Sequence, residues 1–270
     1  MPSIFILILI FFLILAGIWG FFIEPKKIKT EKISFKIKNL PSPFKGFKIV
    51  HLSDFHSSKF GQKENKVLKI LNKLKADLIL ITGDVIGRRT KDLESCQKFW
   101  KELSKNYTGK IFGVYGNHDH RNRKFGELTE LLRENKIDFL DNASRKIEKD
   151  GESIYLLGVD DPHLGYDDIE KVMEGLAENV PKILLAHSPE IFRKIKEKNI
   201  DLVLVGHTHG GQIDIPFLSN FALPLKYDKK YKKGFFKEGF TFLYVNRGIG
   251  ETFCPIRINA FPEITLIQLE

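Results

Sequence analysis

Leu202–Gln212 reads LVLVGHTHGGQ, an apolar run that ends at a glycine and is followed at once by two histidines. Val203 and Val205 favour a β-strand, and the glycine at 206 lets the chain turn sharply where that strand ends. His207 and His209 then lie at the carboxyl end of a strand, where open α/β sheets bind their ligands. Taken alone, the stretch is equally consistent with a polar loop that carries two incidental histidines.

The same arrangement recurs upstream, because other apolar runs also end in polar side chains of the kinds that bind metals. These runs are predicted as strands over Phe47–Leu52, Leu78–Thr82, Ile111–Tyr115 and Lys182–Ala186. The polar side chains that follow them are Asp54, His56, Asp84, Asn117, His118 and His187. The carboxyl ends of parallel strands meet at one edge of a sheet, so segments far apart in the sequence can converge there. We therefore expect one centre built from all of these loops.

Segments with helical periodicity alternate with the strands. Helices are predicted over Val67–Leu74, Leu93–Leu103, Phe125–Arg133, Ile169–Glu178 and Ile191–Lys198. Further strands are predicted over Ile33–Ile37, with the alternation of an edge strand, and over Ile154–Val159, Phe240–Asn246 and Ile264–Leu269. Strands that alternate with helices and then close with β segments predict an α/β layered sandwich with a mixed central sheet. The sequence shows no internal repeat and no clear second domain boundary.

The candidate ligand atoms are oxygen and imidazole nitrogen, without sulfur. Cys96 and Cys254 lie far apart and form no CxxC motif, which suits a reducing compartment and argues against a thiolate site. This donor set suits divalent manganese, iron or zinc and disfavours copper(I) and iron–sulfur clusters. The candidates are too many for one tetrahedral ion, so two ions are expected, and Asp84 is able to bridge them. Two adjacent ions suit phosphoryl chemistry, because they lower the pKa of a shared water and neutralise charge on the transition state.

A family resemblance is carried by the ordered motifs Asp54-Phe55-His56, Gly83-Asp84, Gly116-Asn117-His118-Asp119, His187 and Gly206-His207-Thr208-His209. Together they resemble the calcineurin-like metallophosphoesterases, with matching order and spacing from Lys48 to His209. The tail motifs Val245-Asn246-Arg247-Gly248-Ile249-Gly250 and Pro262-Glu263-Ile264 are similar to the bacterial membrane-associated branch, which holds UDP-2,3-diacylglucosamine pyrophosphatase-type and related phosphodiesterases. The resemblance implies a layered α/β/β/α sandwich with mixed central sheets. It also implies a metal-dependent phosphoric ester or pyrophosphate hydrolase.

The resemblance implies a role for each matching residue. The ligands of one ion would be Asp54, His56 and His209, and those of the other Asn117, His187 and His207. Asp84 would bridge the two ions. The expected cofactors are two divalent metal ions, with manganese favoured and iron or zinc as alternatives.

His118 is implied as the acid that protonates the leaving oxygen or stabilises the transition state, and Asp119 as the residue that orients it. One motif departs from the family pattern, because Gly83–Gly87 reads GDVIG where many members carry a second carboxylate. That departure weakens a protein-phosphatase assignment more than it weakens the metal site.

The remaining histidines are His51, His120 and His163. His51 is expected to pack in the core. For His120, contact with the substrate and a position away from it are equally expected. The third follows Asp160-Asp161-Pro162, which favours a turn with secondary contact to the site. Asn246 and Arg247 either approach the substrate phosphate or have a structural role.

The segment Ile4–Ile23, IFILILIFFLILAGIWGFFI, runs for twenty residues without a charge. At 1.5 Å per residue it spans roughly 30 Å, the thickness of a bilayer's hydrocarbon core. A cleaved signal peptide would need a positive n-region and a small-residue cleavage site, and a core helix apolar on every face is not expected at a terminus. We interpret the segment as an uncleaved, single-pass transmembrane anchor. By the positive-inside rule, the lysines that follow place the catalytic part in the cytoplasm: Lys26, Lys27, Lys29 and Lys32.

The expected organisation is an anchor over residues 1–25, a basic membrane-proximal segment with the first strand over 26–46, and a metallophosphoesterase catalytic domain over 47–270. The net charge of +9 favours an anionic partner. Together with the anchor and the aromatic and lysine side chains of Phe217–Phe236, it favours a phosphorylated, lipid-linked substrate. Within the resembling branch, hydrolysis of UDP-2,3-diacylglucosamine in lipid A synthesis is the most concrete candidate.

Other functions stay open. A general or cyclic-nucleotide phosphodiesterase is the main alternative. A nuclease is less favoured, because the chain shows no nucleic-acid-binding module and no specific nucleic acid partner is expected. A binding protein that has lost catalysis is disfavoured, because the bridging aspartate and the GNHD histidine are both present. The sequence leaves the oligomeric state undetermined.

Overall fold

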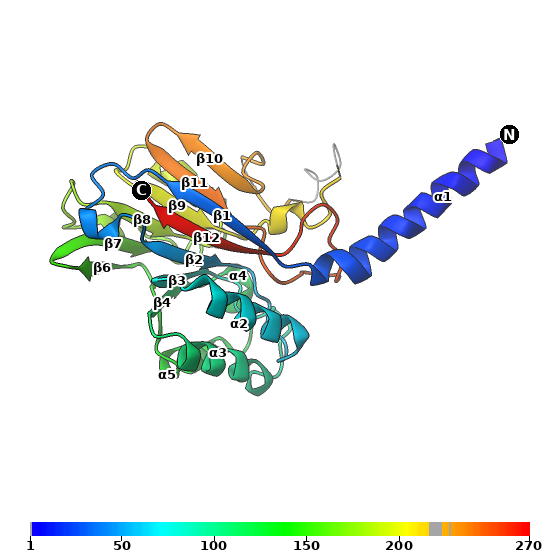
Figure 1. Cartoon of the computed structure of the whole chain (residues 1–270), viewed down its shortest axis with the longest axis horizontal. Coiled ribbons are helices and arrows are strands. Elements are labelled where there is room, and N and C mark those ends of the chain that lie inside the picture. Colours follow the sequence, from blue (N-terminus) through cyan, green and yellow to red (C-terminus); the bar gives the residue numbers. More distant parts are fainter. Residues whose placement is uncertain (1, 216–222, 227) are drawn as a thin grey trace.

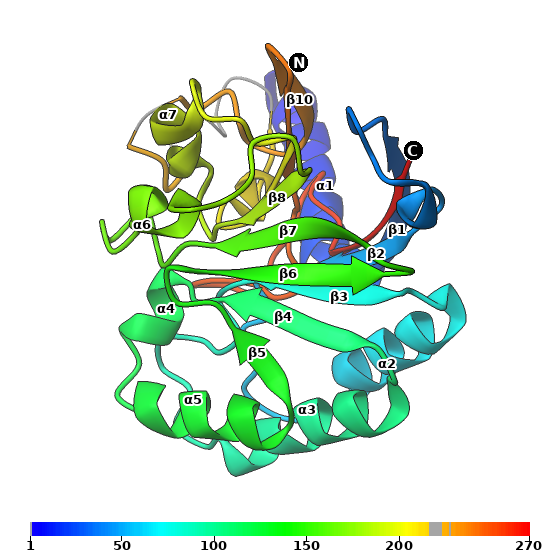
Figure 2. The ribbon, with the colours of Figure 1, turned by 90° about the vertical axis from the view of Figure 1, so that its left-hand side faces the viewer.

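A computed structural model describes residues 2–215, 223–226 and 228–270 of the chain. Two six-stranded sheets lie face to face, with helices on both outer sides (Figures 1 and 2). In spatial order the first sheet contains β1 (Lys29–Phe35), β12 (Glu263–Leu269), β2 (Lys48–Leu52), β3 (Leu78–Thr82), β4 (Lys110–Val114) and β5 (Ile137–Phe139). The second contains β10 (Gly234–Glu238), β11 (Thr241–Val245), β9 (Leu202–Val205), β8 (Lys182–Leu185), β7 (Glu152–Gly158) and β6 (Ala143–Lys149).

Both sheets are mixed, because most neighbouring strands run parallel and a few pairs run antiparallel. In the first sheet β12 pairs antiparallel with β2, and in the second β6 and β10 pair antiparallel with their neighbours. The central strands β3 and β9 are buried at every position. Their continuous apolar sequences, LILIT and LVLV, reflect a strand that is covered on both faces.

Three apolar cores separate the layers. On the outer side of the first sheet, Phe99 and Leu132 of the helices share a core with Ile81 of β3. Between the sheets, Leu80 faces Leu204 in a second core. The third core lies on the outer side of the second sheet. This α/β/β/α layering confirms the predicted fold class, with two central sheets where strand and helix periodicity alone indicated one.

The helices that cover the first sheet are α2 (Gln62–Leu74), α3 (Glu94–Asn106) and α5 (Phe125–Glu134), and α4 (Asn117–His120) is a single turn after β4. The second sheet is covered by the short helices α6 (Ile169–Met173) and α7 (Phe192–Ile195). The helix predicted to reach Glu178 ends at Met173, because Gly175 adopts a left-handed φ of 70° that helical residues do not. The strands β5, β6 and β10 were not predicted, because their burial alternates weakly or they are short.

The N-terminal segment forms α1 (Pro2–Ile18), followed by a π-helical turn at Trp19–Ile23 and a 3₁₀ turn at Glu24–Lys26. It projects away from the rest of the molecule (Figure 1), and its apolar side chains are exposed. Ile4–Lys26 is one helical segment of 23 residues that is long and apolar enough to cross a membrane.

The end of this segment is bonded to the folded body. The Gly20 carbonyl accepts from the Arg257 backbone N–H at 2.9 Å, and a Glu24 carboxylate oxygen accepts from the Ala260 N–H at 2.6 Å. A β-carbon on Gly20 would lie 2.8 Å from Ile258 Cγ1, so only glycine allows this approach. The body and the base of the apolar helix therefore form one continuous structure.

Candidate metal centre

The loops that follow β2, β3, β4, β8 and β9 converge where the two sheets meet at the carboxyl ends of their strands. Backbone amides of one loop hold the carboxylates of another. The His207 N–H donates to Asp54 Oδ2 at 2.9 Å, and the His118 N–H donates to Asp84 Oδ1 at 2.8 Å. The two sheets are thus joined through the site itself.

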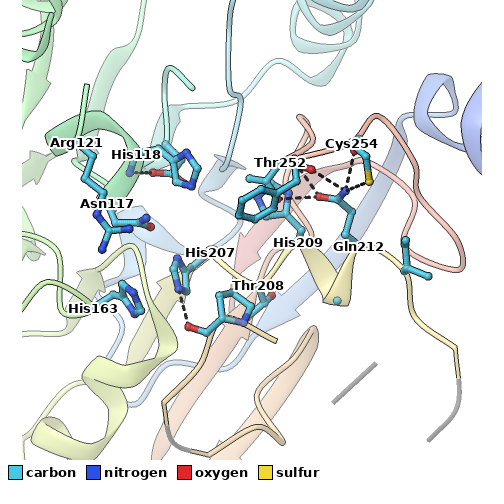
Figure 3. Close-up of a pocket in the computed structure, with 15 residues that line it drawn as sticks. Asn117, His118, Arg121, His163, His207, Thr208, His209, Gln212, Thr252 and Cys254 are labelled. Atoms are coloured by element: carbon cyan, nitrogen blue, oxygen red, sulfur yellow. Dashed lines mark hydrogen bonds between the residues drawn. The ribbon is translucent and has the colours of Figure 1, made fainter. Parts of the chain in front are cut away.

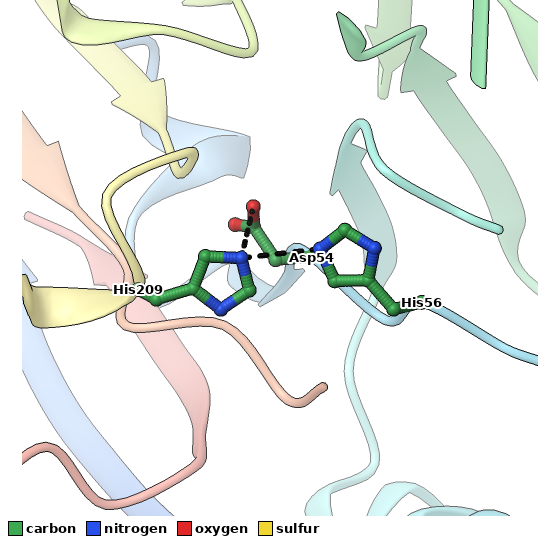
Figure 4. Close-up of side chains that lie close together, drawn as sticks. All are labelled: Asp54, His56 and His209. Carbon is green, nitrogen blue, oxygen red and sulfur yellow. Dashed lines mark hydrogen bonds and ion pairs between the residues drawn. The ribbon is translucent and has the colours of Figure 1, made fainter. Parts of the chain in front are cut away.

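The first group of candidate ligands is Asp54, His56 and His209, all buried (Figure 4). The Nε2 atoms of the two histidines lie 3.1 Å apart, and His209 Nε2 lies 3.4 Å from Asp54 Oδ1. The other ring nitrogen of His209, Nδ1, lies 3.2 Å from the Gly250 carbonyl. A carbonyl only accepts, so Nδ1 carries the proton and the lone pair of Nε2 faces the group.

The second group brings together Asn117, His187 and His207. His187 Nε2 lies 3.2 Å from Asn117 Oδ1 and 3.0 Å from His207 Nδ1. The opposite ring nitrogens again face backbone carbonyls, His187 Nδ1 the Thr82 carbonyl at 2.8 Å and His207 Nε2 the Pro224 carbonyl at 3.2 Å. These carbonyls orient both rings toward the same centre.

Asp84 lies between the two groups. Its Oδ2 atom is 3.5 Å from His56 Nε2 in the first group and 3.4 Å from His187 Nε2 in the second. One carboxylate oxygen therefore faces both groups, which is the position of a ligand shared by two ions.

Burial sets the charge state of the centre. It lowers the pKa of His56 to about 3 and raises that of Asp54 to about 6. Burial opposes ionisation of Asp84, but the charge of His187 holds the pKa of this carboxyl well below its usual range. Burial likewise opposes protonation of His187, and the carboxylate of Asp84 raises its pKa well above the usual value. The centre thus combines carboxylates with imidazoles, of which His56 is neutral and His187 carries a proton stabilised by Asp84. These oxygen and nitrogen donors fit two divalent cations, which would bind in place of that proton.

Glycines make the close approach of the ligands possible. A β-carbon at Gly116 would lie 2.3 Å from Asp84 Oδ1, one at Gly206 would lie 2.2 Å from Asp54 Oδ2, and one at Gly83 would lie 2.7 Å from His187 Nδ1. Several ligand residues also adopt positive φ, a conformation that costs non-glycine residues about 1 kcal/mol or more. They are Asp54, His56, Asp84, His207 and His209. Five of the fourteen non-glycine residues with positive φ in the described part of the chain are thus candidate ligands.

His118 lies beside the centre, with a ring that packs against that of His56 at 4.9 Å between centroids. Its Nδ1 accepts from the Arg88 backbone N–H at 3.3 Å, which leaves the proton of the neutral ring on Nε2. Asp119 instead accepts from backbone N–H groups of Gly116, Val85 and Ile86 at 3.0, 3.2 and 3.0 Å. Among the described hydrogen bonds Asp119 therefore holds the loops around His118, and the partner of the His118 ring is the Arg88 amide.

The other candidate residues have structural contacts. His51 is buried and bonds Thr82 Oγ1 at 2.8 Å, as predicted for a core histidine. His120 bonds Asp160 at 2.6 Å. His163 packs against the His207 ring at 4.8 Å between centroids, so it supports the second group. Arg247 bonds Glu31 and Glu263, which favours the structural role for its loop.

Arg257 was not singled out in the sequence, yet it holds the loop beneath the first group. It is fully buried and donates to the Gly248 carbonyl at 3.2 Å and to that of Ala260 at 2.7 Å. Gly248 lies against Asp54, because a β-carbon there would be 2.6 Å from Asp54 Cβ. A buried arginine on a loop has no periodic pattern, so the sequence offers no signal for this role.

A cavity of about 310 Å³ opens at the centre (Figure 3). Its lining includes the polar side chains of Asp84, Asn117, His118, His207 and His209. It also includes the apolar residues Ile213, Pro224 and Phe253, and Cys254. The Phe217–Phe236 surface lies partly outside the described residues, at 216–222 and 227.

Comparison with known proteins places these features in a family. The model of the family described as "Calcineurin-like phosphoesterase" matches residues 47–211. The "Uncharacterized metallophosphoesterase YkuE" of Bacillus subtilis is 34% identical over 94% of this chain and 91% of its own. The "Phosphodiesterase YaeI" of Escherichia coli is 29% identical over 83% of this chain and 82% of its own. The "Transmembrane protein with metallophosphoesterase domain" of Danio rerio is 30% identical over 98% of this chain and 62% of its own.

Proposed function

The chain belongs to the calcineurin-like phosphoesterase family and is a metal-dependent phosphoester hydrolase, and on that premise we propose that it cleaves a phosphodiester or pyrophosphate bond in a lipid-linked substrate at a membrane surface. Water would add to phosphorus, the bond from phosphorus to the leaving oxygen would break, and that oxygen would take up a proton.

The proposal of a lipid-linked substrate rests on the cavity at the centre, which is lined by both polar and apolar side chains. Its apolar residues include Ile213, which is 36% exposed, and Phe253, which is fully exposed. Ile213 forms a β-bridge with Ile258, the residue that packs on Gly20 at the base of the apolar helix. An acyl chain in this part of the cavity would therefore lie beside the membrane anchor, while the phosphate faces the metal ligands.

The residues of the centre have distinct expected tasks. Asp54, His56 and His209 would hold one divalent ion, Asn117, His187 and His207 the other, and Asp84 both. When bound, the ions would supply Lewis-acid stabilisation of phosphoryl charge and a water of lowered pKa. His118 presents Nε2–H to the leaving oxygen or to a non-bridging oxygen, because the Arg88 amide holds its Nδ1 as an acceptor. Asp119 would position His118 through the backbone.

The finer assignments follow the same reasoning. The donors are oxygen and imidazole nitrogen only, which suits manganese, iron or zinc, and of these three metals we propose manganese. A cytoplasmic catalytic domain follows from the lysines after the anchor, with Lys27 Nζ 4.5 Å from the Trp19 ring centroid at its base. The concrete substrate that we propose is UDP-2,3-diacylglucosamine. A general phosphodiesterase is the second candidate, because one relative is named a phosphodiesterase.

The test compares two substrates that share a pyrophosphate and differ in acyl chains: UDP-2,3-diacylglucosamine in mixed micelles and UDP-N-acetylglucosamine. The full-length protein with Mn²⁺ is expected to prefer the acylated substrate by about tenfold or more in kcat/KM, which corresponds to about 1.4 kcal/mol. The double variant Ile213→Ser/Phe253→Ser is expected to lose that preference, because it removes apolar side chains from the cavity.

The matched control is Phe240→Ser, which removes an exposed phenylalanine in the turn between β10 and β11, 54% exposed. It is expected to keep the wild-type preference. Equal rates on the two substrates in the wild type, with hydrolysis of bis(p-nitrophenyl) phosphate retained, would remove the lipid-linked substrate and leave the general phosphodiesterase.

A further inference from the structure

A second cavity, of about 550 Å³, is lined mainly by cations from two loops. One loop follows β3 and the other follows α4. Their basic side chains, which we call the basic cavity, are Arg88, Arg89, Lys91, Arg121, Arg123 and Lys124. Arg88, Arg89, Lys91, Arg121 and Arg123 are exposed, so this cluster of six cations forms a positively charged surface that attracts anions.

The basic cavity is continuous with the candidate metal centre. Arg88 and Arg89 also line an intermediate cavity together with His56 and His118. Arg121 lines the cavity of the centre itself, where Figure 3 shows it on the His118 side, away from Cys254. A molecule bound at the centre can therefore extend directly into the basic cavity.

Buried hydrogen bonds hold the two basic loops together. Asn122 is 5% exposed and donates to the carbonyls of Gly87 at 2.8 Å and Thr90 at 3.1 Å. The Thr90 hydroxyl donates to the Ser57 carbonyl at 3.0 Å, on the loop that carries His56. These hydrogen bonds fix the backbone of both basic loops relative to the loop that carries His56.

Most of these cations have no carboxylate at ion-pair distance in the described part of the chain. Among the described residues, the only carboxylate paired with one of them is Glu127, which contacts Lys124 at 2.8 Å. Glu251 lines the intermediate cavity but faces Arg257 at 3.8 Å. Arginine binds phosphate through two parallel N–H donors, and these arginines keep their donors available.

We propose that the basic cavity binds a second phosphate group of the substrate, apart from the phosphorus that is hydrolysed. This inference rests on the proposed phosphoesterase function of the neighbouring centre. The substrate is then a phosphoester that carries a further anionic phosphate on the side of Arg88 and Arg123, whereas Cys254 lies at the other end of the cavity of the centre (Figure 3). The specificity of the enzyme is set by both sides of the cleft.

The test uses two chromogenic diesters that differ by one distal phosphate: thymidine 5′-(p-nitrophenyl phosphate) and its 3′-phosphorylated derivative. With the full-length protein and Mn²⁺, kcat/KM is expected to be about tenfold higher for the 3′-phosphorylated diester, a ratio typical of one phosphate–arginine contact. The variant Arg88→Ala/Arg89→Ala is expected to lower this ratio to near one, and Arg123→Ala to lower it in part. The matched control Lys101→Ala/Lys105→Ala removes two exposed charges from α3 and is expected to keep the ratio.

Failure of the inference and failure of the proposed function give different results. Hydrolysis of both diesters at equal kcat/KM, or an equal fall of the ratio in the α3 control, would overturn the basic cavity as a phosphate site. Hydrolysis of neither diester, together with no hydrolysis of UDP-2,3-diacylglucosamine or of bis(p-nitrophenyl) phosphate, would contradict the proposed function. In that case calorimetric titration still decides the inference, because thymidine 3′,5′-bisphosphate should bind about tenfold more tightly than thymidine 5′-monophosphate to the wild type and not to Arg88→Ala/Arg89→Ala.

Discussion

At the residue scale, the rings of His187, His207 and His209 are oriented in the same way. Each ring has one nitrogen against a backbone carbonyl, of Thr82, Pro224 and Gly250 respectively. The carbonyl orients the ring, so the other nitrogen faces the candidate centre before any ion arrives. The conformational entropy of these rings is therefore lost on folding and not on ion binding.

His118 differs from the candidate ligands, because its ring accepts a hydrogen bond from the Arg88 amide and keeps a proton on Nε2. His118→Ala is expected to lower kcat by about 10²–10⁴-fold. If His118 protonates the leaving oxygen, the loss is larger for an alkyl ester than for a p-nitrophenyl ester, whose leaving group needs no proton. Steady-state kinetics with both esters and Mn²⁺ measure the difference.

His120→Ala is the control for this prediction, because His120 bonds Asp160 outside the centre. It is expected to keep kcat within about twofold. Equal losses on the two esters in His118→Ala would favour stabilisation of the transition state over proton transfer. Unchanged kcat in His118→Ala would remove it from the catalytic site.

At the scale of elements, the turns from strand to loop place the ligands. β3 and β4 are covered on both faces, so neither strand can shift within the sheet. The first residue after each strand therefore has a fixed position. Gly83 and Gly116 then bring the loops of these two strands into contact, because each would clash with the other loop or with a ligand if it carried a β-carbon. The site depends on backbone proximity as much as on the ligand side chains.

Gly116→Ala is therefore expected to disrupt the centre without unfolding the protein. Its β-carbon would lie 2.3 Å from Asp84 Oδ1 and 2.5 Å from the Asp84 backbone nitrogen, so the bridging carboxylate must shift. We expect the affinity for Mn²⁺, measured by calorimetric titration of the metal-free protein, to fall about tenfold or more.

The matched control is Gly126→Ala in α5, where a β-carbon meets nothing within 4 Å. This variant should bind Mn²⁺ as the wild type does and should be more stable to unfolding by up to about 1 kcal/mol, because alanine is the better helix former. Wild-type Mn²⁺ affinity in Gly116→Ala would show that the centre tolerates displacement of Asp84.

At the scale of the whole molecule, the apolar N-terminal helix, the loop that contains Arg257 and the metal centre follow one another in space. The loop that contains Arg257 contacts the base of the apolar helix through Gly20 and the first ligand group through Gly248. Arg121, which also lines the basic cavity, lies on the far side of the centre from Cys254 (Figure 3). A lipid-linked phosphoester would thus bind with its apolar end toward the bilayer.

The topology of the chain can be tested with reporters fused after Glu270. The lysines that follow the anchor predict that a green fluorescent protein fusion fluoresces in the cytoplasm and that an alkaline phosphatase fusion is inactive. The variant Lys26→Gln/Lys27→Gln should weaken this orientation, and Lys101→Gln/Lys105→Gln, far from the anchor, should not. An active alkaline phosphatase fusion in the wild type would reverse the orientation and count against a lipid A substrate.

The sequence predicted most of the elements, because their signals are local. The runs at Leu78–Thr82 and Leu202–Val205 are buried on both faces and therefore continuously apolar, and α2, α3 and α5 carry clear helical periodicity. The weak strands β5, β6 and β10 escaped prediction, because a short or half-exposed strand leaves little pattern. The extent of α6 also escaped, because a single left-handed glycine ended it.

By itself, the sequence determined which residues are available for metal chemistry, since aspartate, asparagine and histidine follow consecutive buried strands through His207 and His209. Only the tertiary structure shows how the groups that the resemblance implied come together, because the two sheets join loops that are 153 residues apart, as in His56 and His209. It also decided the parts played by Arg257 and the basic cavity. Their contacts join loops that have no periodicity, and no local pattern in a sequence records which loops will meet.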